Sequence, residues 1–476
     1  MVAALTLVAS ARGAGEIDLT ITDATTRSAV AARMTLITPR GTPLRPRGTI
    51  GWKGHFVTDG TLTLRMPPGK NSFVVERGLE YRAVRGHIEI AQNGEDIKQI
   101  TLTRFANLRD EGWWSGDLDL QRPHDQLPLL MNAEDLYVGI VGGSTAEGPT
   151  SIGEDRLFDE RNLVVADKSN VLLLCRYPES ATVDRTEQLG AVAWARRARS
   201  AGGHVCVGAP SSWDLPVLVA HELVDSVAVM NRQTAATEPA SPVGRIPDKR
   251  KYPAPRGQGR WSQEIYFHLL NCGLKIPCVA GSGSGVTAAA AGQARTYVHC
   301  GSTADLPSWW RALEEGRTSI TNGPLLRPRC DGQYPGHTFT AEPGATLELQ
   351  LQLTLSTRTR IDYLEIIQDG QILHHIRLPE LAKSSGQLPK VPFTSSGWLA
   401  VQAVTSTADT YEFAQSAPFY VQIGDQPRVS AKSAQFFVDW VQQRLKEPDA
   451  EQPEVRTAAE EGLKFWQQRL AEANAP

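Results

Sequence analysis

The sequence predicts a multidomain α/β protein. A central β/α region, closed or nearly closed into a barrel, is expected between two small β-sandwiches, with two helices at the C-terminal end. The 476 residues exceed what one hydrophobic core supports. Short strands separated by turn residues precede residue 109 and return after residue 332, whereas strand and helix patterns alternate between these positions. Two apolar stripes at helical spacing then close the chain.

The changes of pattern give the domain boundaries. We assign residues 1–15 to a signal-like or disordered N-terminus and residues 16–108 to the first sandwich. Residues 109–332 form the β/α region, residues 333–425 the second sandwich, and residues 426–476 the C-terminal helices.

The N-terminus and the composition bear on location and partners. Residues 2–8 are an apolar run, and Ala9-Ser10-Ala11 is a small-x-small step of the kind that signal peptidase accepts. This predicts export to the periplasm or the extracellular space; the alternative is a frayed, Ala-rich terminus. No apolar stretch approaches the roughly 18 residues that a membrane span needs. A net charge of −3 gives no overall attraction to nucleic acid or anionic lipid.

The six cysteines include no CxxC pair. Cys272 and Cys278 are close enough in sequence to bridge, although spacing alone does not show a bridge. We expect most of the cysteines to be buried as small hydrophobic residues.

The first sandwich is predicted from alternation and turn chemistry. Ile17, Leu19 and Ile21 alternate with polar residues, as in a half-buried strand. Asp59-Gly60, between two apolar runs, predicts a β-hairpin. The segment DGTLTLRMPPGKNSF, residues 59–73, resembles the carboxypeptidase-regulatory (transthyretin-like) module, whose members usually serve as adhesive or spacing domains. No residue of this region suggests chemistry.

The central region alternates between the two periodicities. Helical patterns cover residues 189–194, 215–223, 261–270 and 309–315, and strand patterns cover residues 205–207, 226–230, 276–280 and 318–321. Repeated βα units with short connections predict a mostly parallel sheet. The Pro- and Arg-rich residues 237–259 interrupt the rhythm, and we expect them to form a long surface loop.

The second sandwich and the last helices have clear patterns. Leucines at every second position from residue 347 to residue 355 predict a half-buried strand, and Asp369-Gly370 predicts a hairpin turn. A further strand is expected at residues 398–404. The terminal helices carry apolar stripes, which we expect to pack against the rest of the protein rather than against a membrane or a partner. The stripes are Phe437, Trp440, Val441 and Leu445, and Val455, Ala459, Leu463, Trp466 and Leu470.

One stretch concentrates the residue types of a functional site. Residues 112–125, GWWSGDLDLQRPHD, bring together Trp113, Trp114, Asp117, Asp119 and His124 where a strand opens into a loop. Polar groups beside aromatic rings just past a strand are typical of an enclosed site in an α/β protein.

The central region resembles the CehA/McbA group of the PHP-superfamily metallohydrolases. The resemblance rests on GWWSGDL (112–118), AEDL (133–136), WDLPVLVA (213–220), VDSVAV (224–229), AGSGSGV (280–286) and EEGRTSITNGPLL (314–326). It implies a distorted, PHP-like β/α barrel with divalent metal ions at its C-terminal face. Such a cluster lowers the pKa of a bound water and polarises an ester, carbamate or phosphoester bond.

The chain departs from the family pattern at the ligand positions. The HxH pair that the family carries directly after GDL is Asp119 and Gln121 here. The Asp-His type step after AGS is replaced by residues 283–285, Gly-Ser-Gly, and the segment after VDSVAV contains Asn231-Arg232. A guanidinium in a dication cluster would be repelled unless an anion lay between them.

Two groups of candidate residues remain. An altered, mononuclear site for zinc, manganese or iron would be built from Asp117, Asp119 and His204. An anionic or sugar-like ligand is the alternative occupant of the pocket, and the residues expected to bind it are Trp113, Trp114, His124, Asp214, Asn231 and Arg232.

Structural roles compete with these functional ones. Asp214 also fits the N-cap of the helix that begins at Leu215. His204, at a strand start, also fits a buried structural histidine, and Cys206, on an apolar strand, also fits an inert thiol rather than a nucleophile.

Three functions are compatible with this pattern. The missing ligands favour a pseudoenzyme that binds a small-molecule or protein ligand without turnover. A hydrolase with an altered metal site and a cell-envelope scaffold component are the alternatives, and oligomerisation is left open.

Overall fold

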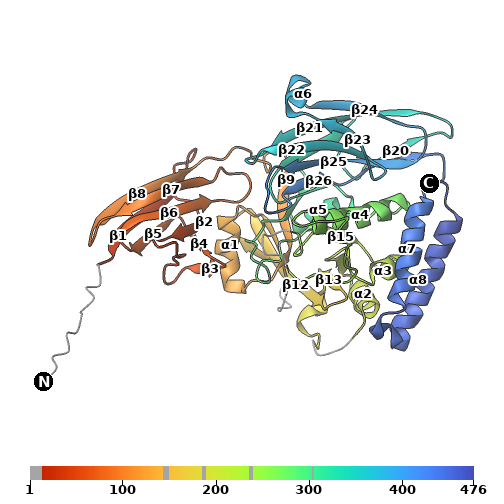
Figure 1. Ribbon diagram of the computed structural model, residues 1–476, viewed down its shortest axis with the longest axis horizontal. Coiled ribbons are helices and arrows are strands. Elements are labelled where there is room, and N and C mark those ends of the chain that lie inside the picture. Colours follow the sequence, from red (N-terminus) through yellow and green to blue (C-terminus); the bar gives the residue numbers. More distant parts are fainter. Residues whose placement is uncertain (1–12, 143–148, 185–188, 235–239, 303–304) are drawn as a thin grey trace. The chain divides into compact units, whose positions relative to one another are not determined.

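The computed structural model describes residues 13–142, 149–184, 189–234, 240–302 and 305–476. The signal-like segment at residues 2–11 therefore lies outside the described residues. The protein is mixed α/β and mostly β, with eight α-helices and four sheets in its described part (Figure 1). The chain divides into two compact units. The first comprises Met1–Ala106 and Asp125–Asp135, and the second comprises Asn107–His124 and Leu136–Pro476.

The first unit contains two sheets around one hydrophobic core. One sheet has the order β5-β1-β8 and the other the order β3-β4-β2-β6-β7. Alternate residues of both sheets, among them Ile17, Leu19, Met34 and Phe56, form this core. The strands are β1 (Gly15–Asp23), β2 (Ala32–Ile37), β3 (Ile50–Trp52), β4 (His55–Thr58), β5 (Thr61–Met66), β6 (Gly69–Glu76), β7 (Val84–Ile90) and β8 (Glu95–Leu102).

The hairpin predicted around Asp59-Gly60 is wrong. β4 pairs with β2 and β3, whereas β5 pairs with β1. The turn therefore carries the chain from one sheet to the other. Gly60 has φ +114, and a Cβ there would lie 2.8 Å from the backbone of Val30, so the turn requires glycine.

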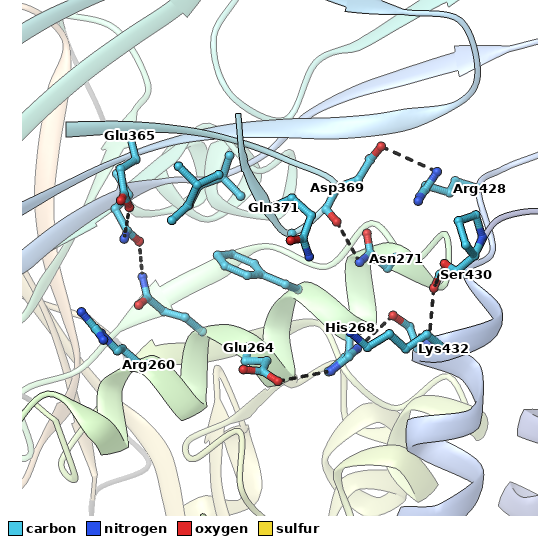
Figure 2. A pocket seen from close by; sticks show the side chains of 18 of the residues that line it. Arg260, Glu264, His268, Asn271, Glu365, Asp369, Gln371, Arg428, Ser430 and Lys432 are labelled. Atoms are coloured by element: carbon cyan, nitrogen blue, oxygen red, sulfur yellow. Dashed lines mark hydrogen bonds and ion pairs between the residues drawn. The ribbon is translucent and has the colours of Figure 1, made fainter. Parts of the chain in front are cut away.

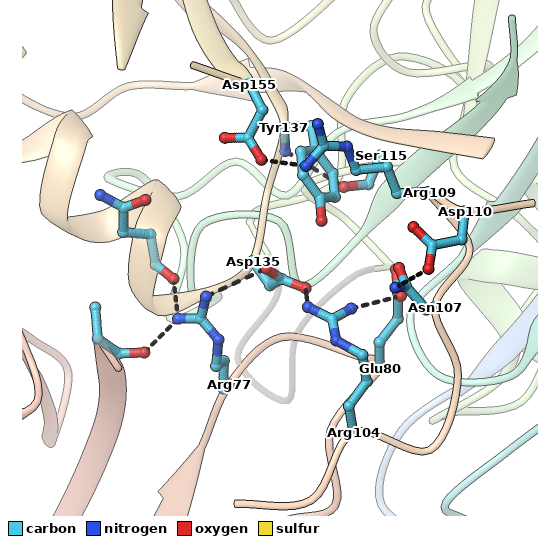
Figure 3. A network of polar contacts seen from close by, with 12 residues as sticks. Arg77, Glu80, Arg104, Asn107, Arg109, Asp110, Ser115, Asp135, Tyr137 and Asp155 are labelled. Atoms are coloured by element: carbon cyan, nitrogen blue, oxygen red, sulfur yellow. Dashed lines mark hydrogen bonds and ion pairs between the residues drawn. The ribbon is translucent and has the colours of Figure 1, made fainter. Parts of the chain in front are cut away.

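The first unit also includes α1 (Leu127–Ala133), whose end is fixed by a buried ion-pair network (Figure 3). Asp135 accepts from Arg104 at 2.5 Å and from Arg77 at 3.3 Å, and Arg104 also donates to Glu80 at 2.9 Å. Arg77 donates to the carbonyl of Asn132 as well. Because Asp135 and Glu80 are each 1% exposed, these charges are paired away from water.

The second unit is organised by one large sheet with the path β16-β15-β14-β13-β12-β10-β9-β17-β18-β26-β25-β22-β23. Its first nine strands come from the region predicted to be β/α. They are β9 (Trp113–Leu120), β10 (Val138–Gly142), β12 (Arg156–Ala166), β13 (Val171–Cys175), β14 (His204–Val207), β15 (Ser226–Met230), β16 (Cys278–Ala280), β17 (Arg295–His299) and β18 (Thr318–Thr321), with β11 (Thr150–Ile152) paired to β12.

The expectation of a mostly parallel sheet is wrong. The eight pairings along these nine strands are divided equally between parallel and antiparallel. One cause is the tight turn at residues 167–170, where the Asp167 side chain accepts from the backbone N–H groups of Ser169 and Asn170. A turn this short leaves no room for a crossover helix, so β13 returns antiparallel to β12.

The ends of the nine-strand region are connected without a strand ladder. In the described residues no ladder pairs β16 with β17 or β18. Instead, the Thr318 hydroxyl donates to the Cys278 carbonyl at 2.9 Å, and the Ala280 N–H donates to the Thr296 hydroxyl at 2.7 Å. No closed barrel of hydrogen-bonded strands is present in the described part of the chain.

The second sandwich shares its sheet with the central region, because β18 pairs with β26. A three-stranded sheet, β19-β21-β24, covers one face of β25 and β22 through a second hydrophobic core. The hairpin at Asp369-Gly370 is confirmed as β22–β23. The strands are β19 (Leu325–Cys330), β20 (Thr338–Ala341), β21 (Leu347–Ser356), β22 (Ile361–Gln368), β23 (Gln371–Ile376), β24 (Gln387–Phe393), β25 (Gly397–Thr405), β26 (Phe413–Ser416) and β27 (Phe419–Ile423).

Helices of the second unit cover the sheet and close the chain. The stripe residues Phe437, Trp440 and Trp466 are fully buried with residues of α3, so the last helices pack on the body as expected. Among the described residues, no helix combines the length and apolar character needed to cross a membrane. The helices are α2 (Ala191–Ser200), α3 (Leu215–Ala220), α4 (Gly257–Asn271), α5 (Leu306–Glu314), α6 (Leu378–Lys383), α7 (Ala431–Arg444) and α8 (Pro453–Ala471).

Candidate functional site

The C-terminal ends of β9, β15 and β16 bring the predicted ligand positions together. Asp119 is the penultimate residue of β9, Arg232 follows β15, and the AGSGSGV loop follows β16. Arg232 donates from Nη2 to Asp119 Oδ1 and Oδ2 at 2.8 and 2.7 Å, and from Nε to Oδ2 at 2.9 Å. Gln121 Nε2 also donates to Asp119 Oδ1 at 2.9 Å. Three positions that the family resemblance links to a metal thus bind one another.

The AGSGSGV loop closes over this pair at van der Waals distance. A Cβ on Gly281 would lie 2.7 Å from the Cβ of Asp119, and one on Gly283 would lie 2.7 Å from the Cβ of Arg232. Gly283 also has φ +64, a conformation that favours glycine. Asp119 and Arg232 are consequently 3% and 5% exposed.

Asp117 is a fully hydrogen-bonded structural carboxylate. Oδ1 accepts from the backbone N–H groups of Asp119 and Ser282, and Oδ2 accepts from the Ser282 hydroxyl and the Gly292 N–H. Complete burial raises the pKa of Asp117 to about 6, and these hydrogen bonds oppose the rise. Asp117 therefore fixes the AGSGSGV loop to the end of β9.

His204 lies at the other end of the sheet. β14 runs in the direction of β9, so His204, at the start of β14, is remote from Asp119, at the end of β9. His204 Nε2 lies 2.8 Å from the Ser226 hydroxyl, and His204 Nδ1 lies 3.5 Å from Glu314. This order matches a Ser-His-acid triad. Ser226, however, is fully buried, so the cluster has no access for a substrate.

Asp214 occupies the N-cap position of α3, but its side chain makes no capping hydrogen bond. It pairs instead with Arg444 of α7, whose Nε donates to Asp214 Oδ1 at 2.6 Å. Arg444 also donates to Asp449 at 2.7 Å. Burial opposes the charge of Arg444, but the hydrogen bonds and charges of the two aspartates raise the pKa of its guanidinium.

The remaining predicted residues are dispersed. Trp113 packs edge-on against His299 and Tyr334, and Trp114 donates from Nε1 to the Gly301 carbonyl. His124 is half exposed and binds Glu160 at 2.7 Å. In the described residues, no hydrogen bond, ion pair or ring contact joins these three residues to Asp119 or Arg232.

Two further predicted side chains have local structural roles. Asn231 uses its amide to hold the turn after β15, donating to the Ala228 carbonyl and accepting from the Gln233 N–H. Burial raises the pKa of the Cys206 thiol to about 12, which favours the inert alternative for that residue.

These residues do not fit a catalytic metal ion. Both oxygens of Asp119 are bound by a guanidinium, both oxygens of Asp117 are saturated by donors, and His204 lies at the opposite end of the sheet. Within the described ranges, no three His, Cys, Asp or Glu side chains are grouped as metal ligands. A zinc ion needs about three such ligands and an open position for water.

A different site, not predicted from the sequence, lies between α4 and β22 (Figure 2). A cavity of about 830 Å³ separates the polar face of the helix from the strand. Gln263 of α4 bridges to Gln402 and Gln415 at 2.7 Å each, and Gln402 donates to Glu365 at 3.0 Å. Burial raises the pKa of Glu365, so its carboxyl takes up a proton more readily than an exposed glutamate.

The sequence contained a partial signal for this cavity. Arg260, Gln263, Glu264, Phe267, His268 and Asn271 recur at helical spacing on one side of α4. Tyr363, Glu365 and Ile367 alternate along β22, Asp369 follows the strand, and all four line the cavity. The pattern of α4 and the pattern of β22 each predict only a solvent-exposed surface, because nothing in the sequence shows that this helix and this strand face each other.

Comparisons with known proteins do not assign the chain to a family. No family model and no curated protein matches it. Two solved structures resemble parts of it weakly. The Bacillus anthracis TIE protein has 15% identity over 29% of this chain and 21% of its own, with a TM-score of 0.16. BcpA, the major pilin subunit of Bacillus cereus, has 8% identity over 86% of this chain and 69% of its own, with a TM-score of 0.21. The chain thus spans about a fifth of the first of these structures.

Proposed function

We propose that this chain is an exported, non-catalytic binding protein built on the PHP-like scaffold of the CehA/McbA group. The observation that carries the proposal is the buried contact of Arg232 with both carboxylate oxygens of Asp119. The guanidinium supplies, from within the chain, the positive charge that a divalent ion would bring to this position.

Electrostatics support this exchange of cations. A second cation beside Arg232 would face strong repulsion in a site that is nearly closed to water. Displacing the guanidinium would leave it buried without its carboxylate partner, which costs about 3–5 kcal/mol. Metal-assisted hydrolysis further needs an open position for water, and the glycines of the AGSGSGV loop occupy the space above the pair.

The topology supports the scaffold part of the proposal. Nine neighbouring strands form one path, and the hydroxyl groups of Thr296 and Thr318 are hydrogen-bonded to the backbone of β16 at its other end. The resemblance places its ligand positions at one end of a barrel, and Asp119, Gln121 and Arg232 meet at one end of this path.

Metal analysis of the purified chain tests the proposal. We expect substoichiometric zinc, manganese and iron by plasma mass spectrometry, with and without metal in the growth medium. We also expect no hydrolysis of p-nitrophenyl esters or bis-p-nitrophenyl phosphate with added Mn²⁺. Stoichiometric metal that is lost in the Asp119→Ala variant, or turnover that requires Asp119, would establish the hydrolase instead. Stable co-purification of a second envelope protein in place of small-molecule binding would favour a scaffold component.

A further inference from the structure

We infer that the cavity between α4 and β22 binds a neutral oligosaccharide. The inference deepens the proposed function by naming the class of ligand. It uses none of the residues at the end of β9, so the two proposals can fail separately.

The cavity wall contains a row of polar side chains across the sheet. Glu365 of β22 lies opposite His375 of β23 and opposite Gln402 of β25, and all three side chains line the cavity. Two of the three, Glu365 and Gln402, are buried. Burying polar side chains costs more free energy than burying apolar ones of similar size. A buried polar row at this place therefore indicates a function rather than a contribution to stability.

The row has both donors and acceptors to offer. Gln402 uses one amide hydrogen for Glu365 and has a second. Glu365 keeps acceptor capacity beyond Gln402 and His375. Sugar hydroxyls donate and accept at once, so they match a wall that mixes amides with a carboxyl group.

Of the four lysine and arginine side chains that line the cavity, two are paired with carboxylates and two are exposed to solvent, which favours a neutral ligand. Lys251 binds Glu264 at 2.6 Å, whereas Arg260 and Lys432 are the exposed pair. Arg428 lies 3.7 Å from Asp369 (Figure 2). Although burial acts to raise it, hydrogen bonds from His268, Lys251 and Tyr252 lower the pKa of Glu264 to about 2. A strongly anionic or cationic ligand would have to compete with these pairs.

A second cavity makes the site long. It has a volume of about 1000 Å³ and shares Lys251, Glu264, His268 and Lys432 with the first. Its walls include Trp213, Trp261 and Phe436, and the half-buried ring of Trp213 offers a face on which a sugar ring can stack. His268 stands at the junction, stacked on Phe436 at 4.1 Å and bonded to Ser433 at 2.9 Å. An amide-lined compartment that continues into an aromatic one fits a chain of sugar units better than a single small molecule.

Calorimetric titration of the full chain tests the inference. The probes are cellotriose, maltotriose, xylotriose and chitotriose, with trigalacturonate, glutamate and diglycine as charged comparators. We expect at least one neutral trisaccharide to bind and the comparators to bind at least about tenfold more weakly.

Variants assign the binding to the cavity. Glu365→Gln keeps the shape of the row and removes its carboxylate, and Phe267→Ala removes the ring beside it; each should weaken the trisaccharide about tenfold. Trp213→Ala should weaken the trisaccharide but leave the matching disaccharide unchanged. Lys390→Ala, an exposed residue of β24, and the double variant Asp119→Leu/Arg232→Met should leave affinity unchanged, with folding of every variant checked by circular dichroism.

Three results would overturn the inference. The inference is overturned if no neutral trisaccharide binds at concentrations up to about 10 mM, if a charged comparator binds better, or if binding survives both Glu365→Gln and Phe267→Ala in folded protein. Stoichiometric metal at Asp119 would instead overturn the proposed function and leave the sugar site standing.

Discussion

Arg232 holds both oxygens of Asp119 within 2.9 Å, and the pair is almost completely enclosed. The two residues are far apart in the chain and lie at the ends of different strands. Because of this contact, the negative charge of Asp119 is neutralised by a side chain of the protein itself.

The first prediction concerns the energy of this pair. Asp119→Ala leaves a buried guanidinium unpaired, so it should lower the free energy of unfolding by about 3–5 kcal/mol. The double variant Asp119→Leu/Arg232→Met should lose much less than the sum of the single variants, because no uncompensated charge remains.

Urea unfolding followed by tryptophan fluorescence measures this cycle. Ten of the eleven tryptophans belong to the second unit, and only Trp52 lies in the first. Glu348→Ala, which removes an exposed pair with Lys390, serves as the control and should cost less than about 1 kcal/mol. Additive losses in the double variant would refute the pairing.

The second prediction concerns Asp117 and pH. Its pKa is raised from 3.8 to about 6 because the carboxyl group is fully buried. The folded protein therefore binds this proton more tightly than the unfolded chain, and the contribution of Asp117 to stability falls as pH rises from 3.8 to about 6. Asp117→Asn cannot ionise. The stability of wild type relative to this variant should fall by about 2 kcal/mol between pH 4 and 7; a flat or rising difference would contradict the assignment.

The third prediction concerns the attachment of the last helices. Arg444 joins Asp214, before α3, to Asp449, before α8, and is 1% exposed. Arg444→Ala should cost about 3–5 kcal/mol and increase proteolysis within α7 and α8. Arg444→Lys keeps the positive charge but loses the planar guanidinium. The free energy of unfolding of this variant should therefore lie between those of the wild type and Arg444→Ala. Arg456→Ala, whose partner Glu460 is exposed in the same helix, should cost less than about 0.5 kcal/mol.

The fourth prediction concerns the thiols. All six cysteines are unpaired, and all except Cys300 are buried. Burial raises the pKa of Cys206, Cys272, Cys278 and Cys330 to about 12, so a thiol-specific disulfide reagent should react with the native protein very slowly. Denatured, unreduced protein should give six thiols per chain. Four would instead reveal the Cys272–Cys278 bridge that the sequence left open.

Local pattern predicted much of the secondary structure. The alternating leucines of residues 347–355 are strand β21, and the hairpin at Asp369-Gly370 is confirmed. The sequence pattern gave a wrong prediction where the result depended on which strand a segment pairs with. The turn at Asp59-Gly60 has the residues of a hairpin, yet it links two sheets, because turn chemistry fixes a reversal of the chain and not the strand that will pair with it.

The candidate site shows the same limit. Asp119 and Arg232 were both singled out from the sequence, and the requirement for an anion beside the guanidinium was foreseeable from Coulomb's law. His204 was grouped with Asp119 because of its residue type, but it lies at the other end of the sheet. Asp214 lies at the N-cap position of α3, but its side chain pairs with Arg444, which lies more than two hundred residues later in the chain.

The sequence by itself determined the periodicities, the turns and the identity of the residues at the ligand positions of the resembled family, because each depends on a short stretch of chain. Only the tertiary structure decided that Arg232 neutralises Asp119, that the glycine loop covers them, and that α4 and β22 enclose a polar cavity. These contacts join residues that are about fifty or more positions apart, and their energies arise from burial and from opposed charges that come together only once the strands are in register.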